Sequence, residues 1–157
     1  MNAFIRAVTG VALLTVAVSS IAAQTLDKKV LSLDAAKAIA AAAEAAAREK
    51  GVGVVVAVVD DGGHLILLHR LDDTQVASVN VGIGKARTAA IYRRPSKDFE
   101  DQIRAGRIAA LALADSTPLQ GGVPIRLDGK VIGAVGVSGD TPQVDEAIAI
   151  AGASAFR

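Results

Sequence analysis

The sequence has no cysteine and no tryptophan, and its 157 residues include one tyrosine, three phenylalanines and two histidines. Without cysteine the chain forms no disulfide, thiolate zinc site, iron–sulfur cluster or cysteine nucleophile. The two histidines, His64 and His69, are too few for a three-histidine metal site within one chain. Aromatic residues make up 3%, so no row of rings is present on which nucleic-acid bases could stack.

An excess of charge of one sign is also missing. Lysine and arginine number 17 against 16 acidic residues, which gives a net charge of +1 and no electrostatic footprint for nucleic acid. We therefore expect no nucleic-acid partner. The motifs GxSxG, HExxH and GxxxxGK[ST] are absent as well. Apolar residues are abundant at 52%, mostly Ala, Val, Leu and Ile, which is enough for the core of one domain.

The first 23 residues have the composition of a signal peptide. Arg6 gives a short positive start, residues 7–18 are an apolar run, and Ser20 and Ala22 are small residues before a cleavage site. These positions predict cleavage after Ala22, and cleavage after Ala23 fits nearly as well. The run is shorter than the ~20 residues of a spanning helix, so we expect no stable membrane insertion after cleavage. Residues 24–157 would then form a single domain in the periplasm or outside the cell.

The remaining chain alternates helical patterns with two hairpins. Turn residues 60–63 and Asp128-Gly129 each separate two apolar strands. Ser32, Thr74 and Thr141 are placed to cap helices. We expect helices over 33–50, 75–92, 96–104 and 142–155 and strands over 52–59, 64–70, 125–127 and 131–137; residues 108–114 fit either state. Antiparallel hairpins with helices packed on them predict an α+β fold, here a three-layer αβα domain.

Four segments in this order resemble the GlcG/HbpS family: AVVDDGGHLILLHRLDD, GKARTAA, GGVPIRLDGKVIGAVGVSG and VDEAIAIAGASAF. The family includes exported haem-binding proteins and the C-terminal domain of PduO-type corrinoid adenosyltransferases. The resemblance covers about residues 31–156. It implies a profilin-like αβα sandwich with a central antiparallel sheet, a homo-oligomer, and haem or a related tetrapyrrole as ligand. The corrinoid activity is not implied, since it belongs to a separate domain. Without cysteine, the cofactor would be non-covalent haem b.

Two cations are candidates for holding a ligand carboxylate, such as a haem propionate. Lys85 lies in the middle of an expected helix among small apolar residues, so it either reaches solvent or awaits an anion. Arg70 ends the strand that precedes this helix. Asp145 and Glu146 lie in the first turns of the last helix, where they suit its dipole better than acid–base chemistry.

Two glycine-containing loops are further candidates for ligand binding. Gly121-Gly122, followed by Pro124, lets a backbone approach a ligand closely, or simply lets the chain turn into an edge strand. Ser138-Gly139 leaves a strand just before the last helix, whose free N–H groups could bind an anion. Ordinary turn and cap chemistry explains the same residues.

Candidate axial ligands for haem iron are His64, His69 and Tyr92. In regular alternation His64, Ile66, Leu68 and Arg70 would share one face of their strand, with His69 on the other. The two imidazoles then cannot hold one metal in a single chain. Tyr92 precedes Arg93-Arg94, which could meet propionates.

The expected function is therefore that of an exported protein that binds haem, or a related tetrapyrrole, as a carrier, scavenger or sensor component. The rival is a small enzyme that acts on a carboxylate metabolite held by Arg70 and Lys85. A scaffold without chemistry is a third reading.

Overall fold

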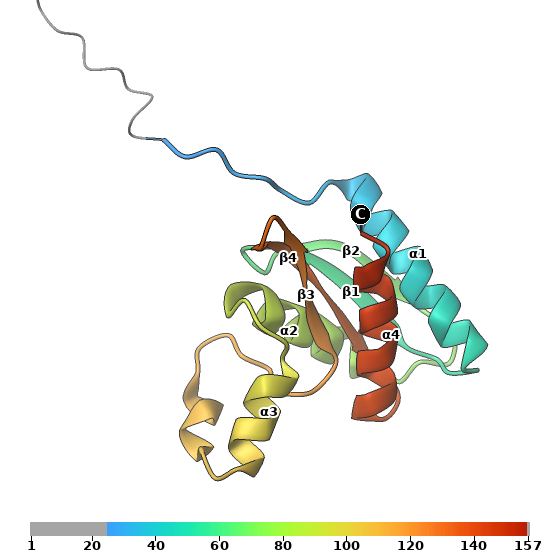
Figure 1. Cartoon of the computed structure of the whole chain (residues 1–157). Helices are drawn as coiled ribbons and strands as arrows, with labels where there is room; N and C mark the ends of the chain where they lie inside the picture. The colour runs from blue at the N-terminus through green and yellow to red at the C-terminus, as the bar shows by residue number, and fades with distance from the viewer. Residues whose placement is uncertain (1–24, 157) are drawn as a thin grey trace, which may run out of the picture.

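The computed structural model describes residues 25–156, so the expected signal peptide lies outside the described residues (Figure 1). The elements in chain order are α1 (Leu33–Glu49), β1 (Val55–Asp60), β2 (Leu65–Arg70), α2 (Ser78–Ile91), α3 (Lys97–Arg104), the 3-10 helix η2 (Ile108–Ala112), β3 (Gly122–Leu127), β4 (Lys130–Ser138) and α4 (Pro142–Ser154). No helix within residues 25–156 is long and apolar enough to cross a membrane.

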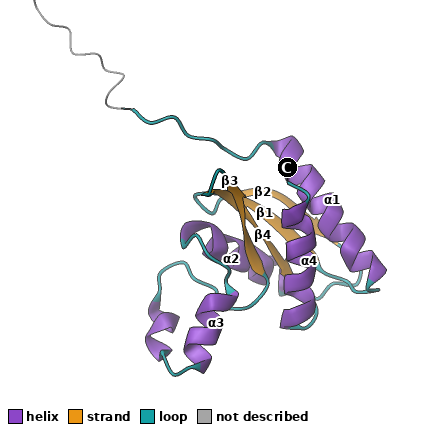
Figure 2. Cartoon of the chain, viewed as in Figure 1, coloured by secondary structure: helices purple, strands orange, loops and turns teal. Residues whose placement is uncertain are grey.

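The four strands form one antiparallel sheet in the order β2-β1-β4-β3. Helices α1 and α4 pack side by side on one face, and α2 covers the other (Figure 2). This confirms the α+β, three-layer αβα arrangement with a central antiparallel sheet. β1 and β4 lie in the middle, which leaves β2 and β3 as the two edges.

The core alternates along β1 because successive strand side chains point to opposite faces. Val54, Val56 and Val58 pack toward α1 and α4, while Ala57 and Val59 pack toward α2. All five are fully buried. A valine buried in this way contributes about 1.5–3 kcal/mol relative to an exposed one.

Helix α2 lies very close to the sheet because glycines face each other across the contact. A Cβ on Gly136 of β4 would clash with the backbone oxygen of Gly82 in α2. On the other face, a Cβ on Gly152 of α4 would lie 3.0 Å from the Cβ of Ala43 in α1. Small residues thus allow close approach both between α2 and the sheet and between the two helices on the other face.

Helix α2 begins later than expected. It starts at Ser78, with Ala77 at the cap position and no side-chain cap. The Thr74 hydroxyl instead donates to the carbonyl of Leu71 at 2.7 Å. The prediction that Thr74 caps a helix from residue 75 was wrong, because this hydroxyl is satisfied by the turn that precedes the helix.

The edge strands also differ from expectation. The pairing register shifts between Val58 and Val59, where Val58 faces Leu67 and Val59 faces Leu65. Ile66 is the extra residue, so it packs with Leu67 on the α1 and α4 side, and the expected regular alternation was wrong. β3 begins at Gly122 rather than 125 and includes Pro124, which an edge strand tolerates because one side of it makes no ladder bonds.

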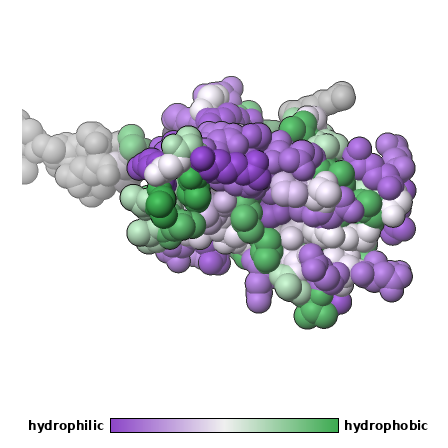
Figure 3. All heavy atoms as spheres, turned by 90° about the horizontal axis from the view of Figure 1, so that it is seen from below, coloured by the Kyte–Doolittle hydropathy of each residue, from purple (hydrophilic) through white to green (hydrophobic). Residues whose placement is uncertain are grey.

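Residues 97–119 extend away from the sheet as α3, η2 and their loops (Figure 1). The ambiguous segment 108–114 is thus mostly a 3-10 helix. Its large side chains are exposed, with Ile108 at 67% and Leu111 at 61%. Figure 3, which views the molecule from the side of α3 and η2, shows patches of apolar atoms between hydrophilic ones. Residues 108–119 thus carry apolar side chains that the described part of the chain, residues 25–156, leaves exposed.

Candidate functional site

An imidazole–carboxylate pair joins β2 to α1. The Nδ1 of His69 lies 3.0 Å from Oε2 of Glu44, and both side chains are about one-third exposed or less, at 35% and 27%. His69 pairs with Val56 in the sheet register, which turns it toward α1. The pair therefore forms where the end of the edge strand meets the C-terminal half of the helix.

Arg48 favours the ionised form of Glu44 in this pair. One helical turn after Glu44, its Nη2 donates to Oε1 of Glu44 at 2.6 Å. Hydrogen bonds from Arg48 and then from His69 lower the pKa of Glu44 below its ordinary value of 4.5. An ionised acceptor favours the His69 tautomer that carries its proton on Nδ1, which leaves the Nε2 lone pair for an external ligand.

Two adjoining hollows open beside this pair. One, of about 410 Å³, is lined by Glu44, His69, Arg70, Leu68 and three residues that it shares with its neighbour. The neighbour, of about 440 Å³, lies between the end of α1 and the loop after β2. The shared residues are Arg48, Leu71 and Asp72.

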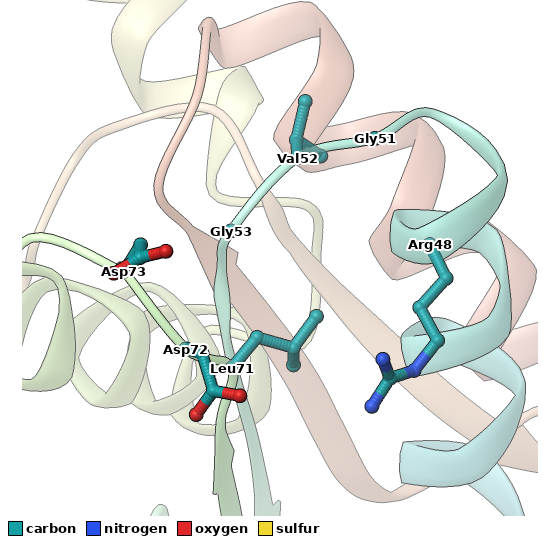
Figure 4. A pocket seen from close by; sticks show the side chains of 7 residues that line it. All are labelled: Arg48, Gly51, Val52, Gly53, Leu71, Asp72 and Asp73. Atoms are coloured by element: carbon teal, nitrogen blue, oxygen red, sulfur yellow. The ribbon is translucent and has the colours of Figure 1, made fainter.

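We call the two together the His69 hollow. Figure 4 shows the second part, where the Arg48 side chain points from α1 into the space that Leu71 and Asp72 border on the other side. Arg70 lines the first part, and its Nη2 donates to the carbonyl of Thr74 at 3.1 Å. Arg70 pairs with Val55 in the sheet register, so its side chain leaves β2 on the α2 side, whereas His69 faces α1. The hollow thus holds the His69 imidazole and the Arg48 guanidinium, with Arg70 at its border.

Lys85 lies elsewhere, in a buried ion pair. Its Nζ is 2.8 Å from Oδ2 of Asp145 and 3.0 Å from the carbonyl oxygen of Val137. The side chains of Lys85 and Asp145 are 5% and 3% exposed. Burial raises the pKa of Asp145, which the hydrogen bond from Lys85 opposes. The ammonium is thus neither solvated nor waiting for a ligand, and a ligand carboxylate would have to displace Asp145.

The first glycine loop packs against this lysine. Gly121 has φ +125°, and a Cβ there would lie 3.0 Å from Nζ of Lys85. A Cβ on Gly122 would clash with the backbone oxygen of Lys85. Pro124 continues into β3. The close approach that these glycines permit is to the protein's own backbone.

The second glycine loop, Ser138-Gly139, also packs against other parts of the chain. The Oγ of buried Ser138 lies 3.4 Å from Oγ of Ser78. A Cβ on Gly139 would clash with the backbone oxygen of Gly53. At the start of α4, Thr141 accepts from the N–H of Val144 at 3.4 Å. The N–H groups of Asp140, Thr141 and Val144 therefore have side-chain acceptors in the chain.

The three candidate iron ligands lie at three separate places. His64 is in the β1–β2 turn, with its side chain 82% exposed and Nδ1 3.4 Å from Oδ1 of Asp60. Tyr92 ends α2, and its hydroxyl donates to the carbonyl of Ala114 at 2.6 Å. His69 alone lines the hollow that also holds arginines. Glu44 and Arg48 were missed from the sequence; their spacing of four predicts a helical ion pair, but not its contact with a strand.

The sequence and structure define a member of the HbpS-like family. Residues 31–154 match the family model described as "Haem degrading protein HbpS-like", and the chain belongs to this family. GlcG of Escherichia coli strain K12 is 44% identical over 111 residues, which cover 71% of this chain and 83% of GlcG.

Solved structures agree with this assignment. The crystal structure of HbpS aligns with a TM-score of 0.82 at 29% identity, over 89% of this chain and 99% of that one. The crystal structure of a PduOC–haem complex aligns with a TM-score of 0.75 at 26% identity, over 82% of this chain and 96% of that one.

The donor groups of the His69 hollow fit haem in kind. An imidazole oriented by a carboxylate is a common axial ligand, and guanidiniums pair with carboxylates such as propionates. Apolar residues form only a small part of the lining of the hollow, since Leu68 and Leu71 are the large apolar residues among those that line it. Within residues 25–156 no three His, Cys, Asp or Glu side chains gather as a metal site.

Proposed function

We propose that this protein is an exported haem-binding protein that holds haem b non-covalently as a carrier, scavenger or sensor component. One observation carries the proposal: the His69–Glu44 pair stands beside Arg48 in a hollow on the surface, with Arg70 at its border. The family model and the haem complex of PduOC support haem as the ligand.

Each residue of the hollow has a separate task in this proposal. His69 offers Nε2 to the iron, and Glu44 holds the ring through Nδ1. Arg48 pairs with one propionate inside the hollow, and Arg70, at its border, pairs with the other. Bound haem would supply the redox chemistry and ligand exchange of its iron. The chain has no cysteine for a thioether bond, so the haem is released intact on denaturation.

A second copy of the chain would complete the binding surface. The His69 hollow offers few apolar groups, whereas a porphyrin has two apolar faces that lose binding energy when they stay in water. A surface separate from the hollow offers a contact by which copies could associate: the exposed side chains of Ile108, Leu111 and Leu119. We therefore propose a homo-oligomer.

Export rests on the sequence of residues 1–23, with Arg6, the apolar run and the small residues at the cleavage site. The proposal places the mature protein in the periplasm or outside the cell. N-terminal sequencing of protein recovered from the periplasm or the medium tests it: the expected first residue is Ala23 or Gln24. Recovery with Met1 retained in the cytosol would contradict export.

The rival function, an enzyme that holds a carboxylate with Arg70 and Lys85, has no support from the geometry. Lys85 is buried against Asp145, and Arg70 lines a different part of the molecule, the His69 hollow. We do not propose it.

A hemin titration of the purified protein, followed by visible absorption, tests haem binding. We expect a sharp Soret band that saturates at a fixed ratio of hemin to chain and survives desalting. A non-saturating, featureless spectrum would contradict the proposal.

A further inference from the structure

A cavity of about 670 Å³ lies at the opposite end of the sheet from the His69 hollow. The His69 hollow is bordered by residues 51–53, before β1, whereas this cavity is bordered by Asp61, just after β1. Figure 1 shows the segment that leads into α1 and the β3–β4 turn together at this end. We call it the basic cavity.

The cavity has an apolar lining on two of its sides. Leu127, Val131 and Ile132 come from the β3–β4 hairpin, and Leu26 comes from the segment before α1. Ile132 is 3% exposed and anchored in the core, while Leu26 is 96% exposed. An apolar side chain so exposed gains from any apolar body that covers it. The cavity therefore offers apolar contact from both the hairpin and the N-terminal segment.

Basic side chains surround this apolar lining. Five line the cavity, and three aspartates reduce their sum to two positive charges. Lys28 is already paired with Asp61 at 2.8 Å. The basic side chains are Lys28, Lys29, Arg93, Arg126 and Lys130. A ligand for this cavity should therefore carry negative charge on an apolar body.

The backbone holds two of these cations in place. Arg126 donates from Nη2 to the carbonyl of Arg93 at 2.6 Å and from Nη1 to the carbonyl of Gly129 at 3.2 Å. Arg93 follows α2 in the left-handed region with φ +58°, a conformation that ends a helix. The Arg126 guanidinium thus ties the end of α2 to the β3–β4 turn and is held in place before any ligand arrives, while Arg93 is fixed through its backbone.

We propose that the basic cavity is a second binding site, for an amphipathic carboxylate with an apolar body and an anionic end. The apolar body lies against Leu26, Leu127 and Val131, and the carboxylate meets Arg93 and Lys130. This site is separate from the haem site proposed at His69 and does not depend on it. Its ligand class is that of long-chain fatty acids.

Displacement of a fluorescent fatty acid by oleate, below the concentration at which oleate forms micelles, tests the proposal. We expect saturable binding of one molecule per chain, weakened by salt. The double variant Arg93→Glu/Lys130→Glu should bind about tenfold or more weakly, because charge complementarity is reversed. Lys37→Glu/Lys50→Glu, an equal charge change at two exposed residues outside the cavity, should bind as the wild type does.

Two comparisons distinguish specific recognition of the carboxylate from nonspecific hydrophobic binding. A long-chain amine with the same tail should bind the wild type weakly and the double variant better. Equal affinity of the wild type for amine and carboxylate, or no loss in the double variant, would overturn the proposal.

The same variants separate this site from haem binding. We expect the double variant to keep the hemin Soret band and His69→Ala to keep oleate binding. Loss of the Soret band in the double variant, together with displacement of oleate by hemin, would make the basic cavity the haem site and overturn a second site. Haem binding that fails altogether leaves the expected oleate result unchanged, so the two proposals fail separately.

Discussion

Lys85 of α2 and Asp145 of α4 form a buried ion pair of 2.8 Å across the end of the central sheet. The two residues are 60 positions apart and lie on helices that cover opposite faces. Asp145 also accepts from the N–H of Asp140 at 3.1 Å, so the pair ties the β4–α4 connection to α2. Its role is in the stability of the fold.

Lys85→Met should strongly destabilise the protein, because it leaves a buried carboxylate without its partner. The expected loss is about 3–5 kcal/mol, as for other broken buried pairs. The double variant Lys85→Met/Asp145→Leu should recover much of this loss, since no charge is left unpaired. Urea unfolding measures both. A Lys85→Met variant within error of the wild type would show that the pair contributes nothing.

Gly122→Ala and Gly51→Ala should cost stability for different reasons. A Cβ on Gly122 meets the backbone of Lys85, which cannot move aside cheaply, so we expect about 1–3 kcal/mol or more. Gly51 has φ +67° and open space around it, so only the backbone conformation is penalised, by about 1 kcal/mol. Thermal or urea unfolding checks the order. A greater loss for Gly51→Ala would contradict the close packing of β3 on α2.

Glu44 gives stability a pH dependence of definite sign. Its folded pKa is lowered below 4.5, so the ionised form is favoured in the folded protein. The contribution is fully present above pH 4.5 and is lost as the pH falls through the lowered pKa. Glu44→Gln should therefore lower the urea midpoint near neutral pH and make the remaining midpoint less sensitive to acid.

The matched control is Glu49→Gln, which removes an exposed carboxylate from the same helix. It should reproduce the acid sensitivity of the wild type. If Glu49→Gln and Glu44→Gln behaved alike, the hydrogen bonds from Arg48 and His69 would have no energetic effect on Glu44.

Association between copies should depend on η2. Leu111→Glu places a charge on the exposed apolar segment, where Leu111 is 61% exposed. We expect a smaller assembly by size-exclusion chromatography with light scattering. Val76→Glu, at a side chain 74% exposed outside this segment, is the control and should keep the wild-type mass. A monomeric wild type, or an unchanged mass for Leu111→Glu, would contradict the proposed contact.

Locally encoded features were predictable from the sequence. Ser32 caps α1 by accepting from the N–H of Ala35, and Thr141 caps α4, as their positions predicted. Both hairpins were marked by turn residues whose backbone preferences are local. The resemblance to the GlcG/HbpS family, which the family model confirms, then indicated how these elements assemble.

Features that arise from tertiary contact were not predictable in this way. The alternation of β2 failed at Ile66 because the bulge depends on pairing with β1. The role of Lys85 was ambiguous because its carboxylate partner, Asp145, lies 60 residues away in the sequence. Asp145 gave no hint of the pair, because its place in the first turn of a helix already explained a negative charge. From the sequence, only the pairing of Glu44 with Arg48 on the same helix was predictable, because its contact with His69 joins residues 25 positions apart.

The most direct test of the account compares the hemin complexes of His69→Ala, His64→Ala and the wild type by visible absorption. We expect His69→Ala to lose or shift the Soret band and His64→Ala to keep the wild-type spectrum, because His69 lines the hollow with Glu44 and Arg48, whereas His64 is exposed in a turn. A wild-type spectrum in His69→Ala, or a shift confined to His64→Ala, would contradict the assignment of the haem site.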